Sequence, residues 1–228
     1  MGVTAAQGRT DLIDRIARHL VQQQPGQRLR VGIDGVCGVG KATFAGELAA
    51  AVEVLGRPAI HVDSDGFHHV RERRYRQGRE SARGYYEDAY DLDSLVDRVL
   101  VPLGLGGSGE FATTVHDLAS DAVITDAVAT APTDAVVLFA ATFIQRDTTR
   151  AHWDEVIYLD ADEDVATQRG VARDSGPLGG VEQARAAYGS RYMAACRIYL
   201  AEQDPRSQAS IVVDHTDPQA PILCRMGQ

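Results

Sequence analysis

The segment from Gly35 to Thr43 constrains this chain more than any other feature of its sequence. It reads Gly-Val-Cys-Gly-Val-Gly-Lys-Ala-Thr and fits the pattern G-x-x-x-x-G-K. Residues 29–34 before it predict a strand and residues 41–54 predict a helix, which is the context that this pattern needs. Glycines let backbone N–H groups approach phosphate oxygens, and the amino end of the helix adds its positive dipole. The segment therefore predicts a phosphate-binding loop.

Lys41 gives this loop its charge. It is the only lysine in a chain of 228 residues that has 22 arginines, and its ammonium can serve as a point charge for the outer phosphates of a nucleotide. A chance glycine turn is the alternative, but the flanking elements and the placement of the single lysine argue against it. We predict that a nucleotide contacts Gly35, Val36, Cys37, Gly38, Val39, Gly40, Lys41, Ala42 and Thr43.

The remaining pattern predicts an α/β fold in which a parallel sheet is covered by helices on both faces. Short apolar runs predict strands at 29–34, 58–62, 135–139, 156–159 and 211–213. Helical spacing predicts helices at 10–23, 41–54, 91–103, 163–173 and 181–203. Strands that are apolar throughout and alternate with helices are typical of parallel sheets. The length fits a single domain spanning residues 1–228, and the glycine-rich segment 103–110 predicts a hairpin connection.

Composition disfavours several functional classes. The 32 acidic residues outnumber the 23 basic ones, so the chain lacks the basic field of a general nucleic-acid binder. The longest apolar stretch, residues 135–144, is about half of a membrane span, and the N-terminus does not resemble a signal peptide. The three cysteines show no C-x-x-C spacing, so neither a disulfide scaffold nor a zinc site is expected. We expect a cytoplasmic protein with no membrane partner.

A pair of carboxylates follows the second predicted strand. Residues 61–68 read His-Val-Asp-Ser-Asp-Gly-Phe-His, which places Asp63 and Asp65 just beyond the strand. In an open α/β sheet the ligand lies beyond the carboxyl ends of the strands, so these groups should face the phosphate loop. A carboxylate there can accept a proton from a hydroxyl that attacks a γ-phosphate. An ordinary Asp-Gly turn is the alternative.

Together these motifs resemble the uridine kinase-like family of P-loop kinases, whose relatives include pantothenate kinase and phosphoribulokinase. The resemblance is carried by GIDGVCGVGK, VDSDGF and YDLDSL, and by HDL at 116–118, the R-x-x-x-R-D pattern at 169–174 and ASIVVDHTD at 209–217. It implies a P-loop kinase fold with a small lid at about residues 169–182. It also implies ATP and Mg²⁺ as cofactors and transfer of the γ-phosphate to a small alcohol such as uridine, a sugar or a pantothenate-like compound.

The resemblance also assigns roles to individual residues. It makes Asp65 the catalytic base, Lys41 a phosphate ligand, and Arg169 and Arg173 the lid arginines that close over the nucleotide. Their i, i+4 spacing puts both arginines on one helix face, although neighbouring acids such as Asp174 could instead make this a salt-bridged surface. On the acceptor side we predict contacts from Asp63, Phe67, His68, Tyr86, Asp88 and His116.

Two departures from the family pattern concern the metal. The residue after the lysine normally carries a hydroxyl for Mg²⁺, but here it is Ala42, with Thr43 one position later as the substitute ligand. The acid usual on the third strand aligns with Ala140. A degenerate homologue that binds nucleotide but transfers little phosphate is therefore the alternative to an active kinase. In the nucleoside segment, His116 replaces the usual aromatic residue and Asp121 replaces the expected histidine, so the resemblance does not fix the acceptor.

The stretch from Arg71 to Arg83 contains six arginines in thirteen residues. These could bind an anionic substrate such as a phosphorylated sugar, or RNA, or form a solvated helix face. The net charge of −9 makes RNA the least favoured of these partners. Whether the chain acts as a monomer or as a homodimer stays open.

Overall fold

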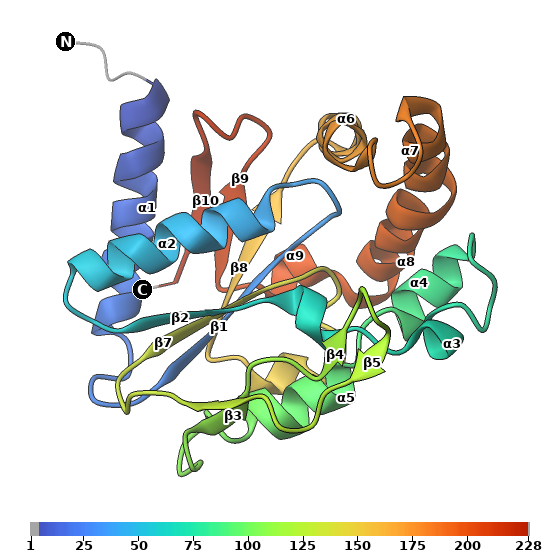
Figure 1. Cartoon of the computed structure of the whole chain (residues 1–228). Coiled ribbons are helices and arrows are strands. Elements are labelled where there is room, and N and C mark those ends of the chain that lie inside the picture. Colours follow the sequence, from blue (N-terminus) through green and yellow to red (C-terminus); the bar gives the residue numbers. More distant parts are fainter. Residues whose placement is uncertain (1–4, 228) are drawn as a thin grey trace.

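The structure is a computed structural model that describes residues 5–227, with side chains from residue 8 onward. Its centre is a six-stranded sheet with the order β10-β9-β8-β1-β7-β2 (Figure 1). The strands are β1 (Leu29–Gly35), β2 (Ala59–Val62), β7 (Val136–Ala140), β8 (Glu155–Asp160), β9 (Ile211–Asp214) and β10 (Ile222–Met226). All are parallel except β10, which pairs antiparallel with β9. The predicted α/β fold class is thus confirmed.

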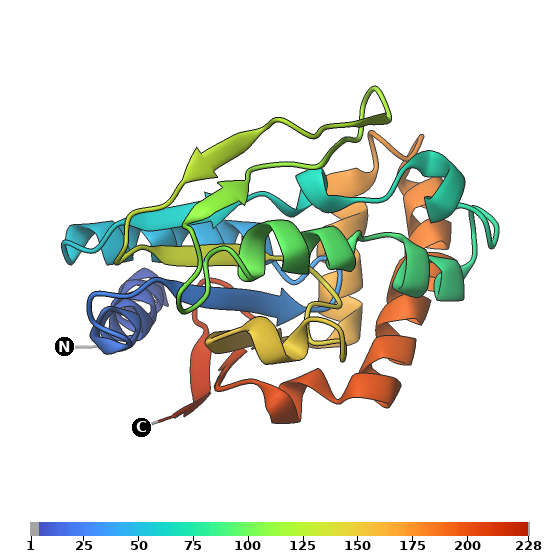
Figure 2. The ribbon, with the colours of Figure 1, turned by 90° about the horizontal axis from the view of Figure 1, so that it is seen from below.

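Both faces of this sheet are buried, as the apolar runs predict. Along β7, Val136 and Leu138 belong to one hydrophobic core while Val137 and Phe139 belong to the other. The first core lies under α1 (Ala5–Gln22), α2 (Lys41–Val54), α6 (Glu163–Asp174), α7 (Val181–Ala187) and α8 (Met193–Gln203). The second lies under α5 (Leu92–Leu95), the π-helical turn Val96–Leu100 and the strands β3 (Glu110–Ala112) and β6 (Val128–Thr130), as Figure 2 shows from below.

The register of the central strands determines where loops emerge. Ile33 of β1 pairs with Ala140 of β7, and Val62 of β2 pairs with Phe139. The carboxyl ends of β1, β2 and β7 therefore lie side by side. The segments that follow them, beginning at Val36, Asp63 and Ala141, leave the sheet at one edge.

Several short elements surround this edge. They are the 3₁₀ turn Ser64–Phe67, α3 (Arg71–Arg74), α4 (Ala82–Asp88), α9 (Pro205–Gln208) and the paired strands β4 (His116–Asp117) and β5 (Ala122–Val123). The arginine-rich stretch is therefore two short helices joined by a turn, and not one surface helix. No helix within residues 5–227 is long and apolar enough to cross a membrane.

Other boundaries differ from the sequence prediction. The strand at β9 is not the last one, because β10 follows it at the sheet edge. The helix predicted at 91–103 ends at Leu100, two residues before Pro102, which lacks a backbone N–H. The glycine-rich segment 103–110 leads from this helix into β3 and is not a hairpin connection, because β3 pairs with β6. The helix predicted at 181–203 is helical throughout but contains a π-helical turn, Tyr188–Tyr192.

Candidate functional site

The phosphate loop has the strained backbone that its glycines permit. Gly35, Gly38 and Gly40 have φ values of 148°, 80° and 102°, which L side chains rarely adopt. A Cβ on Gly38 would also lie 2.1 Å from the carbonyl oxygen of Ala166 in α6. Gly40 is the left-handed residue that begins α2, so the amino end of that helix faces the loop. This geometry fits the phosphates of a nucleotide.

Lys41 lies in the first turn of α2 and its ammonium is enclosed. Its Nζ donates to the carbonyl oxygens of Gly35 and Val36 and to Oγ1 of Thr142, each at 2.9 Å. Burial lowers the pKa of Lys41, because removal from water disfavours the charged form. The ammonium therefore has oxygen ligands from its own loop that phosphate oxygens can replace. Sequence reasoning missed Thr142, whose signal is a hydroxyl residue just after the strand beside β1.

Asp34, near the end of β1, holds the first residue of the phosphate loop in place. Its side chain is fully buried and accepts hydrogen bonds from the Tyr199 hydroxyl at 2.5 Å, from Nε2 of Gln145 at 2.8 Å and from the Gly35 N–H at 2.8 Å. Burial raises the pKa of Asp34. Because one of these donors is the first amide of the loop, Asp34 fixes the point at which the chain leaves β1.

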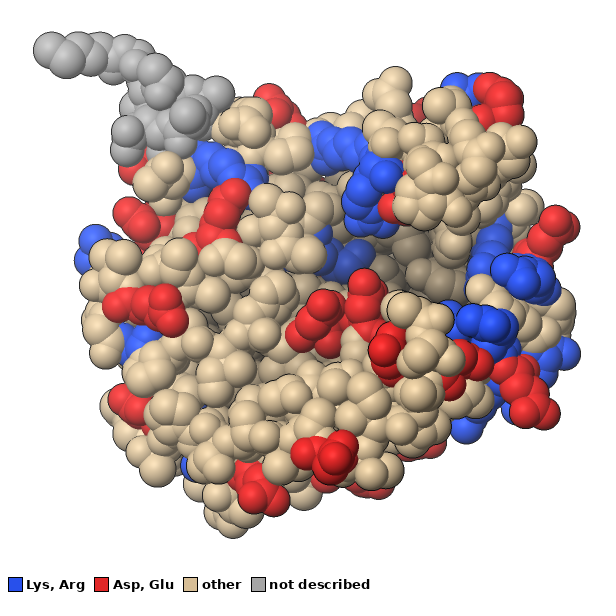
Figure 3. All heavy atoms as spheres, viewed as in Figure 1, with Lys and Arg blue, Asp and Glu red and all other residues tan. Residues whose placement is uncertain are grey.

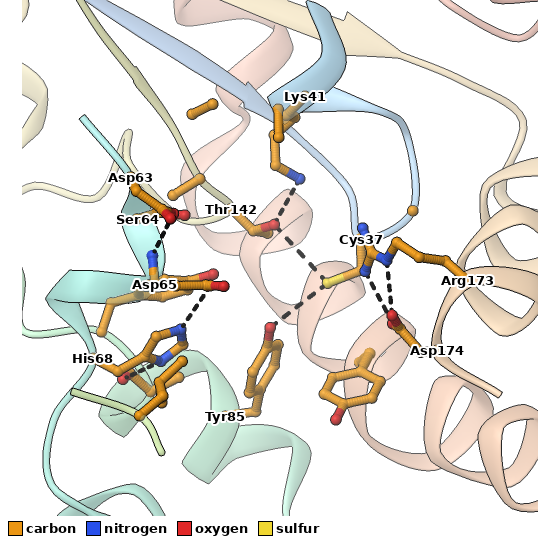
Figure 4. Close-up of a pocket in the computed structure, with 18 of the residues that line it drawn as sticks. Cys37, Lys41, Asp63, Ser64, Asp65, His68, Tyr85, Thr142, Arg173 and Asp174 are labelled. Carbon is orange, nitrogen blue, oxygen red and sulfur yellow. Dashed lines mark hydrogen bonds and ion pairs between the residues drawn. The ribbon is translucent and has the colours of Figure 1, made fainter. Parts of the chain in front are cut away.

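A cavity of about 570 Å³ opens beside the loop. Figure 3 shows the hollow to the right of centre, bordered by both basic and acidic side chains. Its walls come from the phosphate loop, the segment after β2, α3 and α4, the end of β7, the end of α6 and the π-helical turn Tyr188–Tyr192. In Figure 4, Asp65 and His68 lie on one side, Cys37 and Arg173 on the other, and Lys41 between them.

The carboxylates after β2 face this cavity as the sequence predicts. Asp63 caps the 3₁₀ turn by accepting the N–H of Asp65 at 3.0 Å. The Asp65 side chain is 72% exposed, and its Oδ1 lies 3.8 Å from Nε2 of His68. Interaction with His68 lowers the pKa of Asp65, so the carboxylate is ionised at neutral pH. Asp65 is thus available to accept a proton.

The two predicted lid arginines have different surroundings. Arg173 lines the cavity and pairs with Asp174, at 2.7 Å between Nε and Oδ1. Arg169 does not line the cavity, because its guanidinium donates to the carbonyl oxygens of His215 and Thr216. Of the two predicted lid arginines, only Arg173 thus lies at the cavity.

The residues predicted on the acceptor side divide in the same way. Asp63 and His68 line the cavity, whereas the other four do not. Phe67 packs edge-on against Phe139 in the second core, and Tyr86 packs against Phe143 in the first. Asp88 is buried and pairs with Arg76, and His116 is buried with its Nε2 3.1 Å from Asp121. These four side chains have structural contacts instead.

The positions that concern the metal carry methyl groups on the cavity wall. Ala42 and Ala140 both line the cavity, and so does Thr43. Within residues 8–227 no group of three His, Cys, Asp or Glu side chains could hold a metal ion. The carboxylates on the wall are Asp63, Asp65 and Asp174, and besides Thr43 the hydroxyl groups come from Ser64, Thr142 and five tyrosines.

Two cysteines meet at the phosphate loop. The Sγ atoms of Cys37 and Cys196 are 3.7 Å apart, and the Cys37 N–H points to the sulfur of Cys196 at 3.4 Å. The hydrogen bond with Cys196 and the charge of Lys41 lower the pKa of the Cys37 thiol. The loop therefore carries a thiol that favours the thiolate, which sequence spacing alone did not reveal.

Comparison with solved structures places the fold. A candidate uridine kinase from Bacillus stearothermophilus superposes with a TM-score of 0.68 at 23% identity, over 89% of this chain and 97% of that one. A candidate fructose transport system kinase from a Silicibacter species gives 0.69 at 23% identity, over 84% and 95%. D-glycerate 3-kinase from Cryptococcus neoformans gives 0.56 at 12% identity, over 82% and 87%.

No family profile and no curated protein matches the chain by sequence. The likeness is therefore one of fold. The chain has the fold of the P-loop kinases, which is the fold that the resemblance to uridine kinase-like proteins predicts.

Proposed function

We propose that this protein is a cytoplasmic ATP-dependent phosphotransferase that passes the γ-phosphate to a hydroxyl group of a small molecule. One observation carries the proposal: Lys41, Asp65 and Arg173 come from three different segments and line the same cavity. The kinases among the structural neighbours support it. Nucleosides such as uridine, sugars and pantothenate-like alcohols are the acceptors to test.

The residues present fit ATP. Its phosphates would lie against the loop amides and the amino end of α2, where Gly38 and Gly40 leave the backbone uncovered. Lys41 would exchange its carbonyl contacts for phosphate oxygens. Bound ATP supplies the phosphoryl group, Asp65 takes the proton from the acceptor hydroxyl, and Arg173 stabilises the charge on the phosphoryl oxygens.

The residues present do not fit a standard Mg²⁺ site. Magnesium requires octahedral oxygen coordination, and two positions that usually support it, 42 and 140, are alanine. Neither of these two side chains offers Mg²⁺ an oxygen ligand. This observation favours a second candidate function, a nucleotide-binding homologue with little phosphotransfer. Thr43 is the residue that could restore a ligand, since it also lines the cavity.

Two measurements separate the candidates. Purified protein is incubated with ATP, Mg²⁺ and a panel of acceptors, and products are identified by mass spectrometry with Asp65→Asn as the control. A phosphorylated product that Asp65→Asn abolishes supports the kinase. ATP is also titrated with and without Mg²⁺ on wild type and Thr43→Val. If the affinity for ATP is the same with and without Mg²⁺ and no phosphorylated product forms, the nucleotide-binding homologue is supported.

A further inference from the structure

Arg191 lies in the π-helical turn Tyr188–Tyr192 and is enclosed by aromatic rings. Its Cζ is 4.9 Å from the ring centre of Tyr85, 5.1 Å from Tyr75 and 5.4 Å from Tyr192. These rings come from α4, from the residue after α3 and from the same turn as Arg191. Cation–π contacts of this kind hold a guanidinium in place without neutralising it. All four residues line the cavity.

Arg191 has no anionic partner within the described part of the chain. It forms no ion pair there, and its buried Nε has no hydrogen-bond acceptor. Neighbouring arginines differ: Arg173 pairs with Asp174, and Arg185 pairs with Glu182 at 2.9 Å. A buried N–H group without an acceptor lowers the stability of the folded protein. A bound ligand with an acceptor oxygen could provide the hydrogen bond that the protein itself does not.

Arg74 repeats this feature on the same wall. Its Nε is also buried without an acceptor, and these are the only two arginine Nε atoms in that condition among residues 8–227. The Arg74 guanidinium lies 5.5 Å from the ring centre of Tyr75, the ring that Arg191 also contacts. Its Nη2 is 3.3 Å from Asp121, which leaves the other nitrogens for a ligand. Arg79 also lies over the Tyr75 ring, at 4.7 Å, but of the three arginines around this ring only Arg74 and Arg191 line the cavity.

The position of this arginine pair, Arg74 and Arg191, indicates what it would bind. Arg74 and Tyr75 belong to the segment that follows Asp65 in the chain, and both line the cavity. In Figure 4, Asp65 and the phosphate-loop residue Cys37 lie on opposite sides of the cavity. Arg191 is joined to this segment by its contact with the Tyr75 ring, so we place the pair on the side of Asp65 and of the acceptor. Guanidinium groups match phosphate and carboxylate in a planar, two-point geometry.

We propose that Arg191, with Arg74, binds an oxyanion on the acceptor, so that the acceptor is an alcohol carrying a phosphate or a carboxylate. A neutral nucleoside or a free sugar would bring no negative charge to Arg191, whereas Arg74 already pairs with Asp121. This inference rests on the proposed function, because only a phosphotransferase has an acceptor. Binding of the anion at Arg191 does not itself require that phosphate is transferred.

The test measures binding, with the phosphate loop filled by a non-hydrolysable ATP analogue. The probes are matched sets: glycerol, D-glycerate and glycerol 3-phosphate; ribose and ribose 5-phosphate; and acetate and inorganic phosphate alone. Calorimetry and thermal shifts are recorded for wild type, Arg191→Gln and Arg191→Lys. Arg185→Gln is the matched control, because Arg185 is an exposed arginine in the same helical segment and pairs with Glu182.

We expect the charged probes to bind wild type and the neutral ones to bind at least about 10-fold more weakly. Arg191→Gln should weaken the charged probes by roughly 10–150-fold, the range for charge-assisted hydrogen bonds. Arg191→Lys should lose less, and Arg185→Gln nothing. Comparing phosphate with carboxylate probes identifies the anion.

Three results would overturn the inference: equal binding of neutral and charged probes, equal affinities in Arg191→Gln and Arg185→Gln, or no probe bound by wild type at tens of millimolar. Weaker binding of the ATP analogue to Arg191→Gln would also contradict it, by moving Arg191 to the nucleotide. Failure of the proposed function looks different, because the charged probes would bind through Arg191 and no phosphorylated product would form.

Discussion

Replacing Lys41 by methionine should separate nucleotide binding from folding. Methionine keeps the apolar stem and removes the charge. In the absence of nucleotide the variant loses three hydrogen bonds of 2.9 Å, to Gly35, Val36 and Thr142. It also loses the cost of burying an ammonium, which is what lowers the pKa of Lys41. Because these effects oppose each other, we expect a melting temperature close to that of wild type.

With ATP the two proteins should differ clearly. Losing a charge-assisted contact to phosphate costs about 1.5–3 kcal/mol, or roughly 10–150-fold in Kd. At an ATP concentration of about 100 wild-type Kd, mass action adds about 2.7 kcal/mol of stability, and a 30-fold weaker variant gains only about 0.9 kcal/mol. At about 2–4 °C per kcal/mol for a domain of this size, the ATP shift should fall from about 5–11 °C to about 2–4 °C.

The assay is thermal denaturation across an ATP titration, with calorimetry to give Kd directly. An ATP shift that Lys41→Met leaves undiminished would refute the assignment of the loop as the nucleotide site. A variant that is already several degrees less stable without ATP would show instead that Lys41 is mainly a structural residue.

Three further predictions follow from the same geometry. Asp65→Asn should lower kcat by roughly 10²–10⁴-fold while leaving the ATP-induced thermal shift intact, and a larger effect from Asp63→Asn would show that the wrong carboxylate was assigned. Ala42→Thr combined with Ala140→Asp should make ATP affinity depend on Mg²⁺ and raise turnover; unchanged magnesium dependence in calorimetry would contradict the ligand argument. Gly38→Ala should lower the melting temperature by several degrees, because its Cβ would meet Ala166 in α6 at 2.1 Å with a backbone φ of 80°.

The sequence predicts those parts of the fold in which a single physical requirement determines the residue types. β1 and β7 are recognisable because strands buried on both faces must be apolar throughout, and the loop is recognisable because only glycine tolerates its backbone. β10 was missed because most of its residues are exposed at the sheet edge and its apolar run, Ile222 to Cys224, is short and followed by Arg225. The π-helical turn Tyr188–Tyr192 leaves no mark on helical periodicity.

The site was harder to predict because its side chains contact residues that are far away in the sequence. The i, i+4 spacing puts Arg169 and Arg173 on one helix face, but it cannot show that carbonyl oxygens of residues 215 and 216 hold the first. Tyr86 looks like a site residue beside the arginines, yet it packs in the core with Phe143. Arg191 lies more than a hundred residues from Tyr75 and Tyr85, so only the fold brings them together.

Having a single lysine also gives the chain a single cleavage site for a lysine-specific protease. That site is the Lys41–Ala42 bond in the first turn of α2. A protease must unwind this turn before it can cut, so cleavage into residues 1–41 and 42–228 reports local opening at this one point. Arginine, which makes up the rest of the basic residues, is not recognised by such an enzyme. Where reclosing is faster than cleavage, the rate of this one cut in the native protein reports the population of molecules in which the amino end of α2 is open, with no label added.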